Sequence, residues 1–124
     1  MVCMLLSCTH KPEQLPRLQV KGTALVNESG DTVQFKGMSF GWNVLWPRFY
    51  NAGAVRHVVE DWDAELVRAA IGVEIDDDEC QVQNYLNDPD FGKRCACTIV
   101  DAAIENGVYV LVDWHAHGLH TAEA

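Results

Sequence analysis

The sequence predicts an α/β fold: a parallel sheet whose strands alternate with helices, preceded by a small β-hairpin. Strand-like segments at residues 36–40, 66–73 and 109–115 alternate with two segments of helical periodicity. That alternation is typical of a parallel sheet built from right-handed crossovers. Residues 108–112 are apolar at every position before the chain turns polar at Asp113, which predicts a strand buried on both faces.

Length and charge limit the classes of partner. The chain has 124 residues, 48% of them hydrophobic, and a net charge of -9. No run of about 18 apolar residues could span a membrane, so we expect no transmembrane segment. A negative field repels nucleic acid and anionic lipid, which favours a neutral or cationic partner. We expect one domain, over residues 17–124, in a monomeric protein.

The first 16 residues predict a disordered tail or the remnant of an export signal. Cys8 follows a short apolar run and a small residue, as does the lipidated cysteine of bacterial lipoproteins, although no Lys or Arg precedes it. We therefore expect a secreted protein or a cell-surface lipoprotein. At the other end, residues 121–124 resemble the first turn of a third helix, with Thr121 as its cap.

The five cysteines indicate neither a zinc ribbon nor a complete disulfide framework, because they are odd in number and lack a Cys-x-x-Cys pair. Cys95 and Cys97 lie at opposite margins of a predicted helix face and should point apart. We expect both to be small packing residues. The pairing of Cys80 stays open.

A hairpin is predicted first along the chain. Residues 18–20 and 23–26 read as strands around Lys21-Gly22, and turn residues 27–31 precede a returning strand at 32–35. We expect this unit to form a lid over one end of a larger core. Residues 36–40 then form the first strand of that core.

Two amphipathic helices are predicted next. Asn51 is a good N-cap for the first helix, and Asp88-Pro89-Asp90 marks the start of the second, which ends at Asn106-Gly107. Their predicted core faces consist of Val55, Val58, Val59 and Trp62 in the first helix, and of Ala96, Ile99, Val100, Ala103 and Ile104 in the second.

Three features along the chain have more than one interpretation. The aromatic segment 41–50, which holds Trp42 and Trp46, is either buried packing or an exposed platform for flat ligands such as sugar rings. Arg68 interrupts the apolar strand 66–73 and must meet a carboxylate, because a lone guanidinium is costly to bury. That pair is either a scaffold ion pair or a group that orients a catalytic carboxylate. The acidic run 76–79 favours a solvated loop over a calcium site, since the glycine of a calcium hand is missing.

The polar residues after the last strand are the densest chemical signal. His115 and His117 form a His-x-His pattern that can ligate zinc or another divalent metal. Two histidines are not a complete site, however, and we predict no metal and no other cofactor. The alternative is sugar recognition. Four residues suited to it lie at or after the carboxyl ends of adjacent parallel strands: His115, Arg68, Trp42 and Trp46.

Residues 18–115 resemble the N-terminal part of glycoside hydrolase family 5, the cellulase family of (β/α)8 barrels. The fragments that carry the resemblance, in order, are 26–30 (VNESG), 33–39 (VQFKGMS), 49–52 (FYNA), 67–70 (VRAA), 100–104 (VDAAI) and 109–115 (YVLVDWH). The resemblance covers less than half of a family member and implies about the first three strands and two helices of a TIM barrel. A complete barrel takes about 250 residues, so we expect an N-terminal portion of a longer protein.

The resemblance implies a retaining endo-β-1,4-glucanase that acts on cellulose or a related β-glucan. It implies that Arg68 supports the nucleophile and that His115 lines the sugar cleft, with Trp46 near the family's stacking tryptophan. Many members carry a histidine in the first-strand loop where this chain has Gly41-Trp42-Asn43.

Both catalytic glutamates of the family come from later strands. Glu74, Glu105 and Glu123 lie outside the family's motifs, so we expect no catalytic residue in this chain and no activity from it alone. Two other functions stay open: a metal-dependent barrel hydrolase that uses His115 and His117, and a non-catalytic carbohydrate-binding fragment that uses Trp42 and Trp46.

Overall fold

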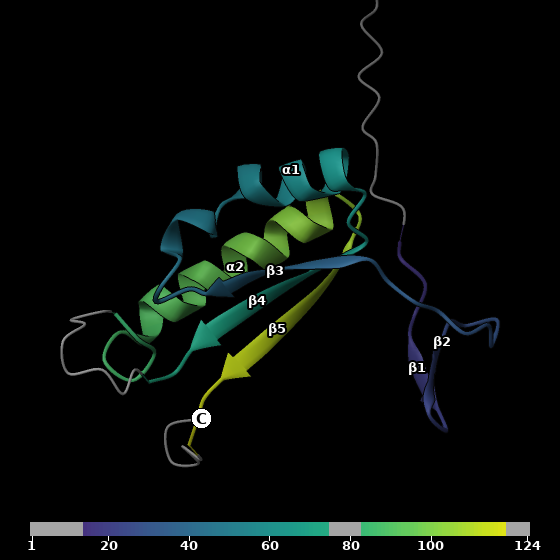
Figure 1. Cartoon of the computed structure of the whole chain (residues 1–124), viewed down its shortest axis with the longest axis horizontal. Coiled ribbons are helices and arrows are strands. Elements are labelled where there is room, and N and C mark those ends of the chain that lie inside the picture. Colours follow the sequence, from purple (N-terminus) through teal and green to yellow (C-terminus); the bar gives the residue numbers. More distant parts are fainter. Residues whose placement is uncertain (1–13, 75–82, 119–124) are drawn as a thin grey trace, which may run out of the picture.

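The computed structural model describes residues 14–74 and 83–118, which form a three-stranded parallel sheet, two α-helices, a short 3-10 helix at Pro47–Phe49 and a separate hairpin (Figure 1). The sheet has the order β3-β4-β5, with β3 at Gly37–Trp42, β4 at Leu66–Gly72 and β5 at Tyr109–His115. Helices α1 (Ala52–Trp62) and α2 (Pro89–Glu105) connect these strands and lie together on one face. The predicted alternation of parallel strands and helices is confirmed.

The hairpin consists of β1 (Gln19–Lys21) and β2 (Ala24–Val26), which pair antiparallel. The predicted returning strand at 32–35 is wrong: only an isolated bridge joins Thr32 to Val26. In Figure 1 the hairpin lies beside the amino-terminal ends of the sheet strands. There the Tyr109 hydroxyl donates to the Pro16 carbonyl oxygen at 2.6 Å. The hairpin therefore lies far from the end of the sheet where polar residues gather.

Helix α1 begins where its cap predicts. The Asn51 side-chain oxygen accepts the backbone N–H of Ala54 at 2.9 Å and so satisfies one of the unpaired donors of the first turn. Val55 and Val58 are buried as expected. Trp62 was expected in the core but is 54% exposed, because it is the last residue of the helix and the chain turns away at Asp63, whose φ is 54°.

Helix α2 also has its predicted cap, since Asp88 accepts the N–H of Phe91 at 3.0 Å. The predicted core face of α2 is rotated by part of a turn from the observed one, since Ile104 is 56% exposed. Cys97 is exposed and is no packing residue, whereas Cys95 is buried, so the two do point apart. The helix buries Gly92, Cys95, Ile99, Ala102 and Ala103.

Strand β4, and not β5, is the buried strand of the sheet. Val67, Ala69 and Ile71 of β4 pack against the helices, and the first two are fully buried. Strand β5 was expected to be buried on both faces, yet Leu111 and Val112 are 47% and 51% exposed. The physical reason is position: β4 has a neighbour on each side, whereas β5 pairs with β4 alone among the described strands.

Several sequence-based expectations fall outside the described residues. They concern the tail with Cys8, the acidic run 76–79 with Cys80, and the turn 121–124 with Glu123. Within the described part of the chain, no helix is long and apolar enough to cross a membrane.

Candidate functional site

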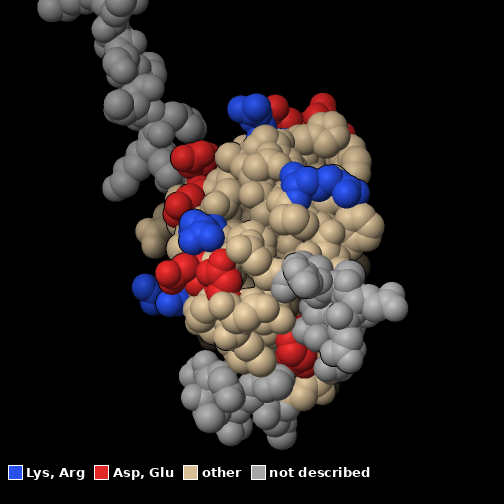
Figure 2. Space-filling view, turned by 90° about the vertical axis from the view of Figure 1, so that its left-hand side faces the viewer, with Lys and Arg blue, Asp and Glu red and all other residues tan. Residues whose placement is uncertain are grey.

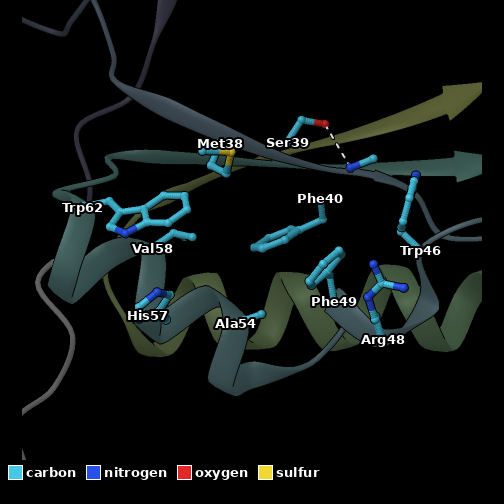
Figure 3. Close-up of a pocket in the computed structure, with 11 residues that line it drawn as sticks. Met38, Ser39, Phe40, Trp46, Arg48, Phe49, Ala54, His57, Val58 and Trp62 are labelled. Atoms are coloured by element: carbon cyan, nitrogen blue, oxygen red, sulfur yellow. Dashed lines mark hydrogen bonds between the residues drawn. The ribbon is translucent and has the colours of Figure 1, made fainter.

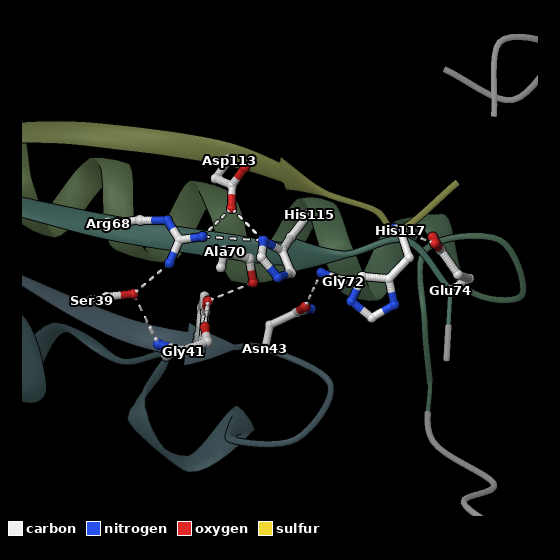
Figure 4. Close-up of polar contacts among 11 residues, drawn as sticks. Ser39, Gly41, Asn43, Arg68, Ala70, Gly72, Glu74, Asp113, His115 and His117 are labelled. Carbon is white, nitrogen blue, oxygen red and sulfur yellow. Dashed lines mark hydrogen bonds and ion pairs between the residues drawn. The ribbon is translucent and has the colours of Figure 1, made fainter. Parts of the chain in front are cut away.

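The polar residues of the sheet lie on the face opposite the helices, toward the carboxyl ends of the strands. Side chains alternate across a sheet, so Arg68 lies on the opposite face from Val67 and Ala69. The parallel register sets Ser39 beside Arg68 and brings Gly72 beside His115. Figure 4 shows the resulting row of polar groups along β3, β4 and β5.

Arg68 is the centre of this row. Its Nη1 donates to the Ser39 hydroxyl at 3.0 Å, and its Nη2 donates to Asp113 Oδ2 at 2.5 Å. The same Nη2 lies 3.1 Å from Nδ1 of His115. The expectation that Arg68 meets a carboxylate is therefore confirmed, and the carboxylate is Asp113. The two side chains keep 34% and 25% of their surface exposed, so solvent partly screens the pair.

Asp113 also orients His115. His115 Nδ1 lies 2.8 Å from Asp113 Oδ2, the oxygen that Arg68 contacts. Nδ1 of His115 therefore lies within hydrogen-bonding distance of both Asp113 Oδ2 and Arg68 Nη2, and its role as donor or acceptor depends on the tautomer of the ring. These contacts engage Nδ1, so Nε2 is the ring nitrogen left for a ligand hydroxyl. Asp113 was not predicted as a site residue, but it lies two positions before His115 and so on the same face of β5.

Trp42 closes the row at the end of β3. Its ring centroid lies 4.6 Å from that of His115, with the rings nearly edge-to-face, and 5.0 Å from that of His117. The strand reaches this position through an irregular register between Ser39 and Trp42. Gly41, in that irregular stretch, has a φ of 71°, a conformation that glycine adopts at little cost.

Asn43 anchors the loop that follows Trp42. It is 1% exposed, its backbone N–H donates to the Ala70 carbonyl oxygen at 3.0 Å, and its Oδ1 accepts the Gly72 N–H at 2.8 Å. The Tyr50 hydroxyl, 2.9 Å from the same Ala70 oxygen, is also buried, and burial raises the pKa of this phenol. These buried contacts tie the loop to the carboxyl end of β4.

Trp46 lies apart from this row. It stacks with Phe49 at a centroid distance of 6.4 Å, and the Arg48 guanidinium lies over both rings. These residues line a cavity of about 540 Å³ between β3 and α1 (Figure 3). The structure thus brings Arg68, His115 and Trp42 together, while the exposed Trp46 forms a second aromatic surface beyond Gly41.

Glu74 is a site residue that the sequence did not reveal. Its Oε1 accepts the backbone N–H of His117 at 2.5 Å and that of Gly118 at 3.0 Å, so it links the segments that follow β4 and β5 (Figure 4). No pattern in the sequence indicates this contact, because the residues are 43 positions apart.

The described residues contain no group of three His, Cys, Asp or Glu side chains that could hold a metal ion. The ring centroids of His115 and His117 are 6.3 Å apart, and Nδ1 of His115 faces Asp113. Figure 2, which views the molecule from the side toward which the strands point, shows Lys and Arg interspersed with Asp and Glu, with much uncharged surface between them. Such a surface suits an uncharged ligand better than a polyanion.

Comparison with known proteins identifies one family. The model of the family described as Cellulase (glycosyl hydrolase family 5) matches residues 26–124. Endoglucanase Z of Dickeya dadantii is 38% identical over 86 residues, which are 67% of this chain and 19% of that protein. An endoglucanase of Halalkalibacter akibai is 30% identical over 111 residues, 86% of this chain and 13% of the relative.

Solved structures agree on the fold. A structure from Cytophaga hutchinsonii superposes with a TM-score of 0.73 at 42% identity, over 82% of this chain and 31% of that one. The catalytic domain of endoglucanase Cel5A of Thermobifida fusca gives a TM-score of 0.69 at 28% identity, over 80% and 30% of the two chains. The chain therefore spans less than a third of the proteins it matches, and its strands and helices correspond to an N-terminal part of their barrel.

Proposed function

Because this chain belongs to glycosyl hydrolase family 5, we propose that the intact protein hydrolyses β-1,4-glucosidic bonds in cellulose or a related β-glucan, with retention of configuration. The observation that carries the proposal is the contact of Arg68 with both Asp113 and His115 at the carboxyl end of a parallel sheet. That end is where α/β barrels place their chemistry.

The substrate-binding role falls to His115, Trp42 and Trp46. The Asp113 carboxylate fixes the His115 ring, which leaves Nε2 to bind a sugar hydroxyl. Trp42, edge-on to that ring, offers an aromatic surface on which the apolar face of a pyranose can stack. Trp46 is 43% exposed and would contact a sugar farther along the chain of glucose units.

The catalytic carboxylates are proposed to lie outside this chain. Retaining hydrolysis needs an acid/base and a nucleophile with carboxyl groups about 5 Å apart. We assign neither role to Glu74, which binds backbone N–H groups, nor to Glu105, at the end of α2. Arg68 would support the nucleophile of the intact protein, because its charge favours a carboxylate in the ionised state that attack requires.

The substrate class rests on the relatives. A structure of the Thermobifida fusca endoglucanase domain is described as a complex with cellotetraose. Three further proposals concern the setting: the protein is a monomer, it acts outside the cell or at its surface, and its barrel domain begins near residue 17. No cofactor is required in this proposal, because carboxylates and water suffice for retaining hydrolysis.

The test is release of reducing ends from carboxymethyl-cellulose by the intact protein, with the anomer formed first identified by proton NMR. The expected first product is the β-anomer. The 124-residue chain alone should release none. An α-anomer would exclude retention, and activity of the short chain would show that its own residues suffice.

A further inference from the structure

We propose that His117 is a further substrate-contacting residue, and that Glu74 is the positioning residue that holds it beside Trp42. The inference rests on the proposed function and deepens it. The ligand is a glucose unit of the β-glucan next to the one that His115 binds.

The Trp42 ring lies against the imidazole rings of both His115 and His117. The Trp42 centroid lies 4.6 Å from that of His115 and 5.0 Å from that of His117. His117 is exposed and Trp42 is half-buried, so a ligand can reach both rings from solvent. An imidazole beside an indole combines a stacking surface with a polar atom, which is the combination that a pyranose requires.

The position of His117 depends on a loop, because β5 ends at His115. Beyond the end of the strand, Glu74 supplies the hydrogen bonds that strand pairing no longer provides. One carboxylate oxygen accepts two successive backbone N–H groups, those of His117 and Gly118, at 2.5 and 3.0 Å. Bonds from backbone N–H groups to a carboxylate are stronger than those between neutral groups. Glu74 is itself held in place, because Val73 donates its N–H to the His115 carbonyl oxygen at 3.1 Å.

The chain offers a matched control for this contact. Glu65 Oε2 accepts the backbone N–H of Lys36 at 2.9 Å, so it makes the same kind of bond across strands. Glu65 directly precedes β4 and therefore lies at the amino-terminal end of the sheet, opposite the site. Removal of its carboxylate tests the general cost of such a bond without changing the position of His117.

The experiment measures kcat and KM for cellotetraose hydrolysis by the intact protein. Glu74→Ala should raise KM about fivefold, the value of one hydrogen bond, with kcat nearly unchanged. Glu74→Gln should raise KM less than Glu74→Ala does, because its amide oxygen can accept the same N–H groups, although without the charge. His117→Ala should raise KM by a similar factor, and the double variant Glu74→Ala/His117→Ala should be no worse than His117→Ala alone. Glu65→Ala should leave KM unchanged.

Each outcome decides between the two proposals. If the wild-type protein does not hydrolyse the substrate, the proposed function fails and this inference with it. If the wild type is active but Glu74→Ala or His117→Ala leaves KM unchanged, the inference alone is overturned. Additive effects in the double variant would show that Glu74 acts independently of His117, which also overturns it.

Discussion

Arg68 and Asp113 are 45 residues apart in the sequence, yet their side chains meet at 2.5 Å across β4 and β5. The contact is diagonal, because Ala70 and not Arg68 is the register partner of Asp113. Asp113 thereby reaches both the guanidinium and Nδ1 of His115 with one oxygen. One carboxylate thus sets the orientation of two groups of the proposed site.

Replacing that carboxylate should therefore lower the proposed activity of the intact protein. In Asp113→Asn the side-chain amide can accept from either Arg68 or His115, but it carries no charge to stabilise them. Hydrogen bonds to charged groups contribute about 1.5–3 kcal/mol, which corresponds to a fall of about 10- to 150-fold in kcat/KM. Asp101→Asn, on the exposed side of α2, is the control and should match the wild type. Wild-type activity in Asp113→Asn would refute the orienting role.

The Trp42 ring should contribute to substrate affinity. Removal of a sugar-stacking surface in Trp42→Ala should weaken binding of cellotetraose by about 0.5–1.5 kcal/mol, or roughly 2- to 12-fold in Kd. Trp42→Phe should recover part of this loss because a smaller ring remains. Titration calorimetry of the intact protein gives the affinities. Trp62→Ala removes another exposed indole, at the end of α1, and should bind like the wild type. Equal affinity of the Trp42→Ala and Trp62→Ala proteins would contradict the assignment.

Because the Tyr50 phenol is buried, we expect the free energy of unfolding to fall at alkaline pH. Burial raises the pKa of its phenol in the folded state above the ordinary 10.0. Above that pH the unfolded chain loses a proton that the folded chain retains, so the free energy of unfolding falls as pH rises. Tyr50→Phe should be less stable near neutral pH by about 1 kcal/mol, since its hydrogen bonds are lost, but should show a flatter alkaline limb.

Urea unfolding of the intact protein at about pH 8 and about pH 11 measures this difference. The control is Tyr109→Phe, which removes a hydroxyl that donates to the Pro16 carbonyl oxygen and should keep the steep alkaline loss. Identical pH dependence in Tyr50→Phe and the wild type would show that this phenol does not control alkaline stability.

The two described cysteines should differ in reactivity toward iodoacetamide. Cys97 is exposed, whereas Cys95 is buried, and burial raises the pKa of its thiol. The thiolate is the reactive form, so alkylation of Cys95 should be at least about tenfold slower at pH near 8. Peptide mass mapping over time gives both rates. In urea the rates should converge, and rapid labelling of Cys95 in the folded protein would contradict its burial.

Removal of metal tests the alternative based on His115 and His117. The proposed retaining mechanism depends on carboxylates, so dialysis of the intact enzyme against EDTA should leave kcat unchanged. If EDTA removes activity, and zinc restores it in the wild type but not in His117→Ala, a metal-dependent hydrolase is favoured instead. Zinc-loaded EDTA at the same concentration cannot remove zinc and is the control for ionic strength.

Much of the fold was predictable because its signals are local. Asn51 and Asp88 cap the helices that follow them, since a cap requires only a side-chain acceptor and an N–H three residues away. The aligned fragments also identified the family and its barrel. The faces of the helices were predicted less well, since Trp62 and Ile104 are apolar yet exposed. Hydrophobic periodicity does not tell which apolar residues the sheet covers.

By itself, the sequence determined the order of strands and helices, their caps and the need of Arg68 for a carboxylate, because these follow from propensity, local hydrogen bonding and the cost of burying a charge. Only the tertiary structure decided that the carboxylate is Asp113, that Trp42 and not Trp46 contacts His115, and that Glu74 reaches the segment after β5. These contacts depend on the register between strands and on the irregular stretch at Gly41. Neither is encoded by residues that are close together in the chain.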